Sequence, residues 1–278
     1  METELKKAVL EVYKTAEASG IAGVLIGALI AELSPEIGPD YPRFRRTNDA
    51  DFALHVPDWT SFQALRARLI ELDFKQHPKI EHRLLKGSVL VDLIPYGKGV
   101  APNGKLRWPE SDLEMNVIGF EEACAAAGKK VLDDGPDIPI ITIPGFVLLK
   151  IIAFLDRQAR WDAKHKDDAG DIYYWLKNYA SGTADDRRFA VTAKLGGETL
   201  EYETAGAALL GLEVGQLASK EAGELVDKFL NKSGDLYTPF MDAIAGRAID
   251  EDQDKQKRKE ALDLLNAFEK GCRRARQG

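Results

Sequence analysis

The sequence contains few cysteines and no long apolar run. Its only cysteines, Cys124 and Cys272, lie far apart and match no metal-binding or redox-motif spacing, so we expect no disulfide framework. The longest apolar stretches, 21–33 and 146–155, are shorter than the ~20 residues that a membrane-spanning helix needs. The N-terminal residues lead into an amphipathic pattern and not into an apolar signal core. We therefore expect a cytoplasmic protein with no membrane partner.

Histidine and an excess of basic charge are also missing. The four histidines show no H-x-x-x-H or similar metal-binding spacing. The 278 residues include 38 Lys+Arg and 45 Asp+Glu, a formal net charge of −7, which argues against a basic coat for nucleic acid or anionic lipid. Residues 40–110 differ, because they hold 12 basic and 9 acidic side chains. This stretch can therefore still present a positive face to a phosphate.

The composition, with 45% hydrophobic and 30% charged residues, is typical of a globular chain, and the length suggests two modules. Periodicity and turn residues predict strands at 23–26, 48–56, 73–77, 80–86, 88–95, 130–132 and 138–141. They predict helices at 2–18, 59–72, 146–157 and 167–179, and mainly helices beyond. Asn103-Gly104 predicts a hairpin turn. We predict an α+β fold, with a mixed sheet and flanking helices in residues 1–142 and a helical domain in residues 143–278.

Three carboxylates fall on two of the predicted strands. Asp49 and Asp51 lie two residues apart, so on a strand both side chains project from one face. Asp92 interrupts the apolar stretch Ser88–Pro95, where an unpaired charge is costly. Carboxylates this close need a cation, and hard oxygen ligands favour Mg²⁺. We predict that the three acids bind two Mg²⁺ ions about 4 Å apart, an arrangement used for nucleotidyl transfer.

Groups that bind phosphate are also present near these acids. Gly27 and Ala28 form a predicted strand-to-helix turn whose backbone N–H groups can face an anion. Arg45 and Arg46 directly precede the carboxylate strand and can bind phosphates bidentately. Arg83 and Lys86 lie on the strand opposite Asp92. Each either lines the same site or is a solvated cation on a hairpin.

The predicted helices contain a second group of charges. Lys150 is the one charged residue in the apolar stretch 146–155, and a buried lysine needs a charged partner or an anionic ligand. Arg157 returns to the same helix face two turns later, and Asp168 and Asp171 share a face through their i,i+3 spacing. Two interpretations stay open. Lys150 forms an internal salt bridge with one of these acids, or it contacts a triphosphate while the acids orient it.

The remaining aromatic and basic clusters have simpler interpretations. We interpret Trp161, Tyr173, Tyr174 and Trp175 as core or groove residues in preference to a platform for stacked bases. The segment 250–276 begins acidic and ends basic, as the helix macrodipole favours, although its arginines could also contact RNA phosphates.

Two sets of motifs resemble a known family. The first resembles the nucleotidyltransferase superfamily with a DNA polymerase β-type core: Gly27-Ala28, then Arg46-Thr47-x-Asp49-x-Asp51, then Asp92. The second is similar to the helical signature of AbiEii/AbiGii-type toxin nucleotidyltransferases of type IV toxin–antitoxin systems: Lys150, Arg157, and Asp168-x-x-Asp171. The chain departs from the superfamily at Ala28, where Ser or Gly is common, so a hydroxyl contact to a phosphate is lost there.

The resemblance implies a nucleotidyltransferase-like fold, a nucleoside triphosphate (ATP, GTP, CTP or UTP) as donor, Mg²⁺, and release of pyrophosphate. It also implies an RNA acceptor such as tRNA and an antitoxin protein as partner. The implied catalytic residues are Asp49, Asp51, Asp92 and Lys150. The implied nucleotide-binding residues are Gly27, Ala28, Arg45, Arg46, Thr47, Arg157, Asp168 and Asp171. Transfer to a small molecule such as an aminoglycoside, and a non-catalytic binding protein on the same fold, stay open as alternatives.

Overall fold

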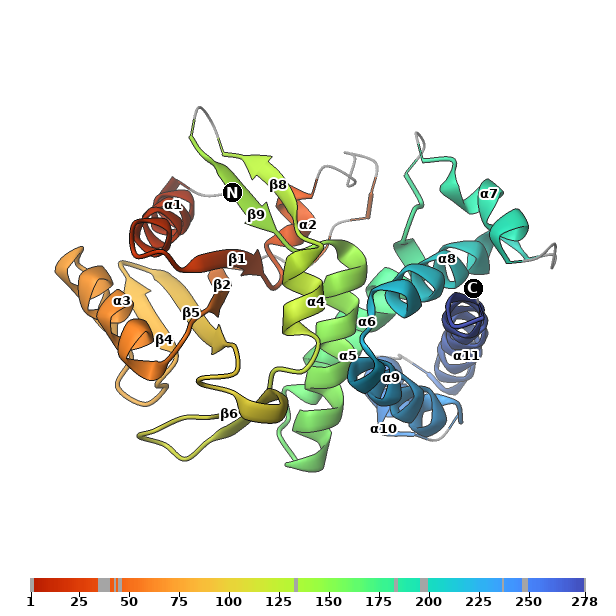
Figure 1. The fold of residues 1–278 in the computed structure, drawn as a ribbon. Coiled ribbons are helices and arrows are strands. Elements are labelled where there is room, and N and C mark those ends of the chain that lie inside the picture. The colour runs from red at the N-terminus through yellow and green to blue at the C-terminus, as the bar shows by residue number, and fades with distance from the viewer. Residues whose placement is uncertain are drawn as a thin grey trace. The chain divides into compact units, whose positions relative to one another are not determined.

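The computed structural model describes residues 3–34, 41–42, 44, 47–132, 135–182, 185–195, 200–236, 238–246 and 250–277. The chain forms two compact units, whose elements are labelled in Figure 1. One unit contains the described residues of the ranges 1–37 and 44–142, and the other contains those of 38–43 and 143–278. No helix in the described part of the chain is long and apolar enough to span a membrane.

A mixed sheet of seven strands forms the centre of the first unit, in the order β3-β4-β5-β2-β1-β9-β8. Its strands are β1 (Ala22–Ile26), β2 (Asp49–His55), β3 (Lys75–Gln76), β4 (Arg83–Lys86), β5 (Val89–Tyr96), β8 (Gly128–Val131) and β9 (Asp137–Ile140). Strand β2 runs parallel to β5 and antiparallel to β1, while β1 runs parallel to β9. A separate hairpin contains β6 (Lys105–Arg107) and β7 (Glu114–Asn116).

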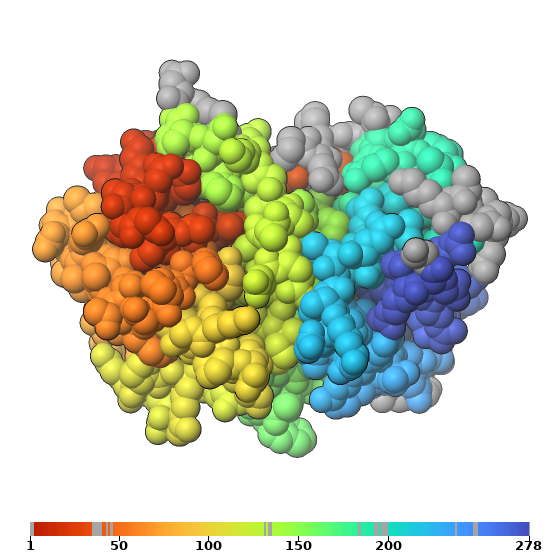
Figure 2. Space-filling view, viewed as in Figure 1, coloured from red at the N-terminus to blue at the C-terminus, as the bar shows by residue number. Residues whose placement is uncertain are grey.

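Helices flank this sheet: α1 (Thr3–Ala18), α2 (Ile30–Leu33), α3 (Trp59–Glu71) and α4 (Phe120–Ala125). Helix α1 contacts β1, β2, β5 and α3, and Figure 2 shows its atoms, in red, at the surface of the unit. A Cβ on Gly23 of β1 would lie 3.3 Å from the Leu54 side chain and 3.6 Å from Ala16 Cβ, so α1 covers the sheet face that carries Leu54. Since side chains alternate along a strand, Asp49 and Asp51 project from the opposite face.

The predicted hairpin turn at Asn103-Gly104 is wrong. Both residues have the left-handed φ that such a turn needs, 58° and 70°, but they follow Pro102 in a short 3₁₀ turn that leads into β6. A Cβ on Gly104 would lie 2.3 Å from Cγ1 of Ile118. The left-handed conformation therefore serves a close approach to the chain after β7 and does not reverse a hairpin.

The second unit consists of helices and contains no strand among its described residues. Its helices are α5 (Ile143–Ala159), α6 (His165–Asn178), α7 (Arg187–Lys194), α8 (Tyr202–Leu217), α9 (Lys220–Ser233), α10 (Pro239–Ala245) and α11 (Glu251–Ala275). Helix α8 is buried along most of its length and contacts α5, α6, α7 and α11. A mixed sheet with flanking helices, followed by a set of helices, confirms the predicted α+β class.

Helices α8 and α11 pack with their backbones in contact. A Cβ on Gly211 of α8 would lie 2.0 Å from the carbonyl oxygen of Phe268, and a Cβ on Gly271 of α11 would lie 2.0 Å from that of Ala208. Figure 1 shows the two helices side by side. The absence of side chains at both glycines therefore sets how closely the helices approach.

The C-terminal helix α11 begins and ends as the sequence predicts. Asp250 caps its first turn by accepting a hydrogen bond from the Gln253 N–H at 2.8 Å, and further acids occupy that turn. Near its other end Arg273 pairs with Glu269, and Arg276, just beyond the helix, pairs with Asp227. Two of the arginines that RNA could contact therefore already have acidic partners.

A short segment from the first half of the chain belongs to the second unit. Tyr41 is buried, and a Cβ on Gly182 would lie 2.8 Å from its ring carbon Cε2. The Tyr174 hydroxyl of α6 donates a hydrogen bond to the carbonyl oxygen of Pro42. Residues 41 and 42 thus pack with helices that begin more than a hundred residues later.

Candidate active site

The acids predicted from the sequence share one face of the sheet. Asp51 on β2 pairs in register with Asp92 on the parallel strand β5, and Asp92 pairs with Arg83 on the antiparallel strand β4. Asp49 lies two residues before Asp51 on the same strand and so projects from the same face. Asp49 and Asp51 are half-buried, whereas Asp92 is buried with 8% of its surface exposed. The sheet therefore brings Asp51, Asp92 and Arg83 into one row across three strands, with Asp49 on the same face two residues before Asp51.

The turn after β1 lies directly against Asp51. Gly27 has a φ of +84°, and a Cβ at this position would lie 1.9 Å from Oδ2 of Asp51. The N–H groups of Ile30 and Ala31 bond to the carbonyls of Gly27 and Ala28, both at 3.3 Å, so the chain turns here into the single-turn helix α2. Glycine is needed at position 27 both for its backbone conformation and for its lack of a side chain.

The segment before β2 is described only in part. Thr47 Oγ1 accepts a hydrogen bond from the Asp49 N–H at 3.1 Å, which fixes the start of the strand. Arg45 and Arg46 lie outside the described residues. Ala28 is buried, with 4% of its surface exposed. Phosphate contacts of these four residues stay predictions.

Arg83 binds Asp92 through a two-pronged contact. Its Nε lies 2.7 Å from Oδ1 and its Nη2 lies 2.8 Å from Oδ2, so each carboxylate oxygen accepts a hydrogen bond. The hydrogen bonds to Asp92 raise the pKa of Arg83 above its ordinary value, and the charges of Asp49 and Asp51 add to this effect. Of the two interpretations of Arg83, the structure excludes the solvated cation, because its side chain is only 14% exposed and pairs with Asp92. Lys86, by contrast, pairs with Glu11.

The acids have the oxygen chemistry that Mg²⁺ favours, but their arrangement does not fit the predicted pair of Mg²⁺ ions. Both oxygens of Asp92 accept hydrogen bonds from Arg83. Within the described ranges, no group of three or more His, Cys, Asp or Glu side chains is placed so that it could hold a metal ion. Arg83 supplies the positive charge that the sequence assigned to a metal at Asp92.

The sequence contained a signal for the Arg83–Asp92 contact. Gly87 has a left-handed φ of +60°, and Gly87 and Ser88 form a two-residue loop between β4 and β5. Such a loop pairs Lys86 with Val89, and three further steps along the antiparallel ladder place Arg83 opposite Asp92. The hairpin register therefore predicts the pair without knowledge of the rest of the sheet.

His82 is a second neighbour of Asp92 that the sequence did not single out as a site residue. Its Nε2 lies 3.8 Å from Oδ2 of Asp92, and its ring packs against Trp108 with the centroids 5.4 Å apart. The His82 carbonyl also accepts a hydrogen bond from the Leu93 N–H at 2.9 Å. These contacts hold the imidazole beside the Arg83–Asp92 pair.

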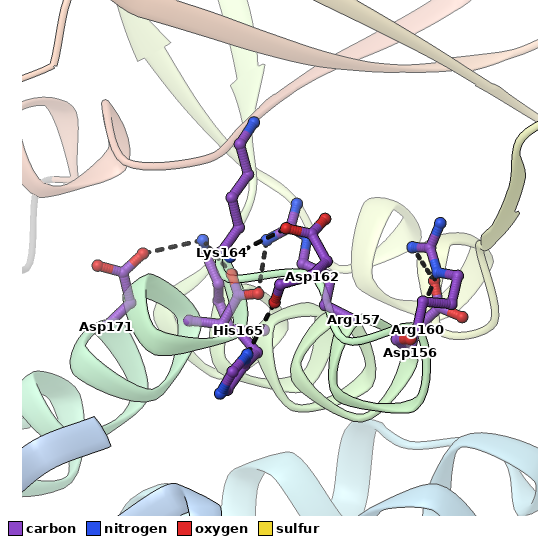
Figure 3. Close-up of polar contacts among 9 residues, drawn as sticks. Asp156, Arg157, Arg160, Asp162, Lys164, His165 and Asp171 are labelled. Carbon is purple, nitrogen blue, oxygen red and sulfur yellow. Dashed lines mark hydrogen bonds and ion pairs between the residues drawn. The ribbon is translucent and has the colours of Figure 1, made fainter. Parts of the chain in front are cut away.

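In the second unit, the four charged residues of the helical motif form one network (Figure 3). Lys150 Nζ lies 2.9 Å from Oδ1 of Asp168 and 2.9 Å from Oδ2 of Asp171, and Arg157 Nη1 lies 2.5 Å from Oδ2 of Asp168. Burial alone would lower the pKa of Lys150, but the two acids raise it above its ordinary value. The structure therefore contains the internal salt bridge, and contact of Lys150 with a triphosphate stays a prediction.

The loop between α5 and α6 presents an exposed tryptophan, against the interpretation of Trp161 as a core or groove residue. Trp161 has a φ of +58° and is 94% exposed. Its N–H bonds to Gln158 O at 3.2 Å, and the Asp162 N–H bonds to Arg157 O at 2.9 Å. This is the pattern of a helix end at which glycine is favoured, so a tryptophan there costs about 1 kcal/mol. Figure 3 shows the neighbouring Lys164 pointing away from the charge network.

Comparison with known proteins gives little further information. No protein-family model matches the chain, and no curated protein matches it. The solution structure of the antibiotic-resistance factor ANT(2'')-Ia gives a TM-score of 0.39 at 13% identity, over 62% of this chain and 84% of that one. The crystal structure of ANT(2'')-Ia in complex with adenylyl-2''-tobramycin gives a TM-score of 0.39 at 12% identity, over 61% and 88%. Similarity at this level carries no argument about activity.

Proposed function

We propose that the chain is a nucleotidyltransferase, which moves a nucleoside monophosphate from a nucleoside triphosphate to an acceptor hydroxyl. The observation that carries the proposal is the row of carboxylates on one sheet face, with Asp51 of β2 in register with Asp92 of β5. Strands this apolar gain nothing in stability from grouped acids, because burying like charges is costly. Grouped acids on such strands therefore indicate a functional site, and the resemblance of the motifs to nucleotidyltransferases supports nucleotidyl transfer as its reaction.

Each acid has a proposed role. Asp49 and Asp51 would hold a divalent cation, which when bound stabilises the negative charge that develops on the phosphates. Asp92 accepts the proton of the acceptor hydroxyl, whose oxygen bonds to the α-phosphorus while the bond to pyrophosphate breaks. Gly27, which has no side chain, lets the Asp51 carboxylate lie directly against the turn.

RNA is the proposed acceptor, in a toxin that an antitoxin protein restrains. The resemblance to toxin nucleotidyltransferases supports this choice, and so does Trp161. An aromatic ring that is 94% exposed, held at a conformational cost and followed by the exposed Lys164 and Lys166, suits stacking on unpaired bases. A small-molecule acceptor and a non-catalytic protein are the alternative outcomes of the test.

The test is incubation of the full chain with each labelled nucleoside triphosphate, with total RNA in one reaction and an aminoglycoside in another. We expect label in RNA, and a decrease of roughly a hundredfold or more for Asp51→Asn. Asp112→Asn, which changes an exposed acid of the same unit, is the matched control and should retain full activity. Label in the aminoglycoside alone would contradict the RNA acceptor, and label in neither would contradict transfer.

The role of Trp161 needs its own comparison. We expect Trp161→Ala to raise the RNA concentration needed for half-maximal transfer by about tenfold, because a stacked base contributes about 1–3 kcal/mol. Phe189→Ala removes another exposed aromatic, 74% exposed on α7, and should leave that concentration unchanged. Equal effects of the two substitutions would speak against base stacking on Trp161.

A further inference from the structure

We propose that a cavity in the helical unit binds a free amino acid with a large apolar side chain. The cavity has a volume of about 510 Å³ and is lined by residues of α6, α7, α8 and α11. A volume of this size is typical of pockets that bind small organic molecules. The inference goes beyond the proposed nucleotidyl transfer, because the described residues of the lining include neither the acids of the sheet face nor the charge network of Lys150.

Arg188 of α7 brings a buried positive charge to the wall of the cavity. Only 5% of its surface is exposed, and its guanidinium donates hydrogen bonds to the carbonyl oxygens of Tyr179, Lys177 and Tyr202 at 2.8, 2.9 and 3.2 Å. A Cβ on Gly206 would lie 2.6 Å from Nη2, so α8 fits closely around the guanidinium. Within the described part of the chain no carboxylate pairs with Arg188, and burial lowers its pKa. Its charge, and one N–H on each of Nη1 and Nη2, therefore stay available to an anionic group.

The first turn of α8 lines the same cavity and adds two donors. Glu201, at the N-cap, makes no side-chain hydrogen bond to this turn. The N–H groups of Tyr202 and Glu203 have no acceptor within the helix, and none among the other described residues. The positive end of this 16-residue helix favours a negative group, as the guanidinium does. Arg188 and the first turn of α8 together favour a carboxylate.

The lining also contains acids that a simple anion would meet. Lys177 and Glu260 pair with each other at 2.6 Å, so their charges cancel. The other charged residues of the lining are Arg188, Lys259, Glu203 and Asp263. Neither Glu203 nor Asp263 forms an ion pair with another described residue. A zwitterion would place its ammonium group near these acids and its carboxylate near Arg188, so its charges match the lining better than those of phosphate do.

Apolar surface in the cavity indicates the kind of side chain. Leu264 of α11 contributes to the lining although it is only 2% exposed. Tyr202 contributes a ring that is held in place by Phe189, with the centroids 5.4 Å apart, and by the Arg188 guanidinium, 5.2 Å from its centroid. A small side chain would make few contacts in a cavity of this volume. A large apolar side chain therefore fits these surfaces best.

The test is isothermal titration calorimetry of the full chain with L-phenylalanine, L-leucine and L-methionine, in the absence of nucleotide and RNA. We expect the tightest of the three to bind at least about tenfold more tightly than glycine and than its own N-acetyl and carboxamide analogues, each of which lacks one of the two charges. Glu203→Gln/Asp263→Asn should weaken binding of the free amino acid by about tenfold and should not weaken binding of the N-acetyl analogue. Glu224→Gln, which changes an exposed acid of α9 outside the lining, is the matched control and should bind as the wild type does.

Arg188→Met should abolish binding, and circular dichroism establishes whether this variant is folded. Since Arg188 also bonds to three carbonyls, the variant of the two acids decides the matter if Arg188→Met unfolds. The proposal is overturned if none of the three amino acids binds, if either analogue binds as tightly as the free amino acid, or if the variant of the two acids binds as the wild type does. Tighter binding of inorganic phosphate than of every amino acid would also overturn it, in favour of a simple anion site. None of these outcomes depends on nucleotidyl transfer.

Discussion

Gly27 is constrained in two ways, by its backbone conformation and by its contact with Asp51. The left-handed φ of Gly27 disfavours any side chain, and the Asp51 carboxylate occupies the space a Cβ would need. Gly20 has a similar φ of +68° but nothing within 4 Å of its Cβ position. The two glycines therefore separate the cost of backbone conformation from the cost of the clash.

We expect Gly20→Ala to lower the free energy of unfolding by about 1 kcal/mol, which is the cost of a left-handed alanine. Gly27→Ala should lower it by about 3 kcal/mol, because the clash with Asp51 adds to that cost, and should also abolish transfer. Denaturant titration of both variants measures the difference. In Gly27→Ala/Asp51→Ala the additional loss should largely vanish, and equal losses in the two single variants would contradict the clash.

At the level of single residues, the sequence predicted which side chains share a strand face better than it predicted how exposed each side chain is. The period of a strand was enough to place Asp49 and Asp51 on one face. The exposure of Trp161 could not be predicted, because a tryptophan occupies a helix-end position at which a glycine would have marked the turn. The Asn103-Gly104 signal failed for a related reason, since a left-handed pair is compatible with more than one kind of turn.

Among the helical elements, α5 contacts α9 and α10 through aromatic rings and α6 through charges. Phe154 of α5 packs edge-on against Phe229 of α9 and Phe240 of α10, with ring centroids 5.7 Å apart in both pairs. Close to this apolar cluster in sequence, Lys150 meets Asp168, which is fully buried. The helix pair therefore depends on a buried ion pair whose partners are costly to separate.

We expect Lys150→Met to lower the free energy of unfolding by about 3–5 kcal/mol, because it removes the lysine from two buried carboxylates, of which Asp168 keeps its contact with Arg157. Lys177→Met, which breaks the half-exposed pair with Glu260 on the same unit, should cost no more than about 1 kcal/mol. Denaturant titration of both variants makes the comparison. Equal losses would show that the buried network contributes no more than a surface pair.

The difference between wild type and Lys150→Met also has a predicted pH dependence. The folded pKa of Lys150 lies above its ordinary value of 10.5, so its stabilisation is fully present below that value and is lost only as the pH rises through the folded pKa. The contribution of Lys150 itself should thus stay constant between about pH 6 and 9, whereas the gap should narrow as the pH falls, because the carboxylates left buried without the lysine in the variant take up protons. A gap that closes as the pH rises through this range would mean that Lys150 is not held as a cation.

Helices and strands were predicted accurately where the apolar repeat was long. Prediction was weaker where the structure depends on which strands pair. Helix α5 extends the prediction for 146–157 at both ends, and β5 lies within one residue of the predicted 88–95. The sheet order was not predictable from periodicity, because it depends on which strands meet. The pairing of Arg83 with Asp92 was within reach, since the two-residue loop before β5 fixes the register.

On the scale of the whole molecule, each unit contains one cysteine. Cys124 lies on α4 in the first unit and Cys272 on α11 in the second, and both thiols are buried. Burial raises the pKa of each thiol to about 12. The two cysteines can therefore report separately on the integrity of the two units.

We expect both thiols to resist iodoacetamide at pH 8 in the native protein and to react rapidly in guanidinium. A pKa near 12 lowers the thiolate fraction on the order of a thousandfold relative to an ordinary cysteine, and burial limits access as well. Peptide mapping after labelling at increasing denaturant assigns each transition to one unit. Rapid native labelling of either cysteine would contradict the packing around it.

The short segment at Tyr41 and Pro42 has a consequence for the order of events during synthesis. These residues leave the ribosome long before Tyr174 and Gly182, the groups that they contact in the finished helical unit. A contact between positions 132 residues apart closes a very large loop, whose entropic cost is met only once the intervening chain is ordered. The nascent chain must therefore carry this segment without these partners until Tyr174 and Gly182 have been synthesised.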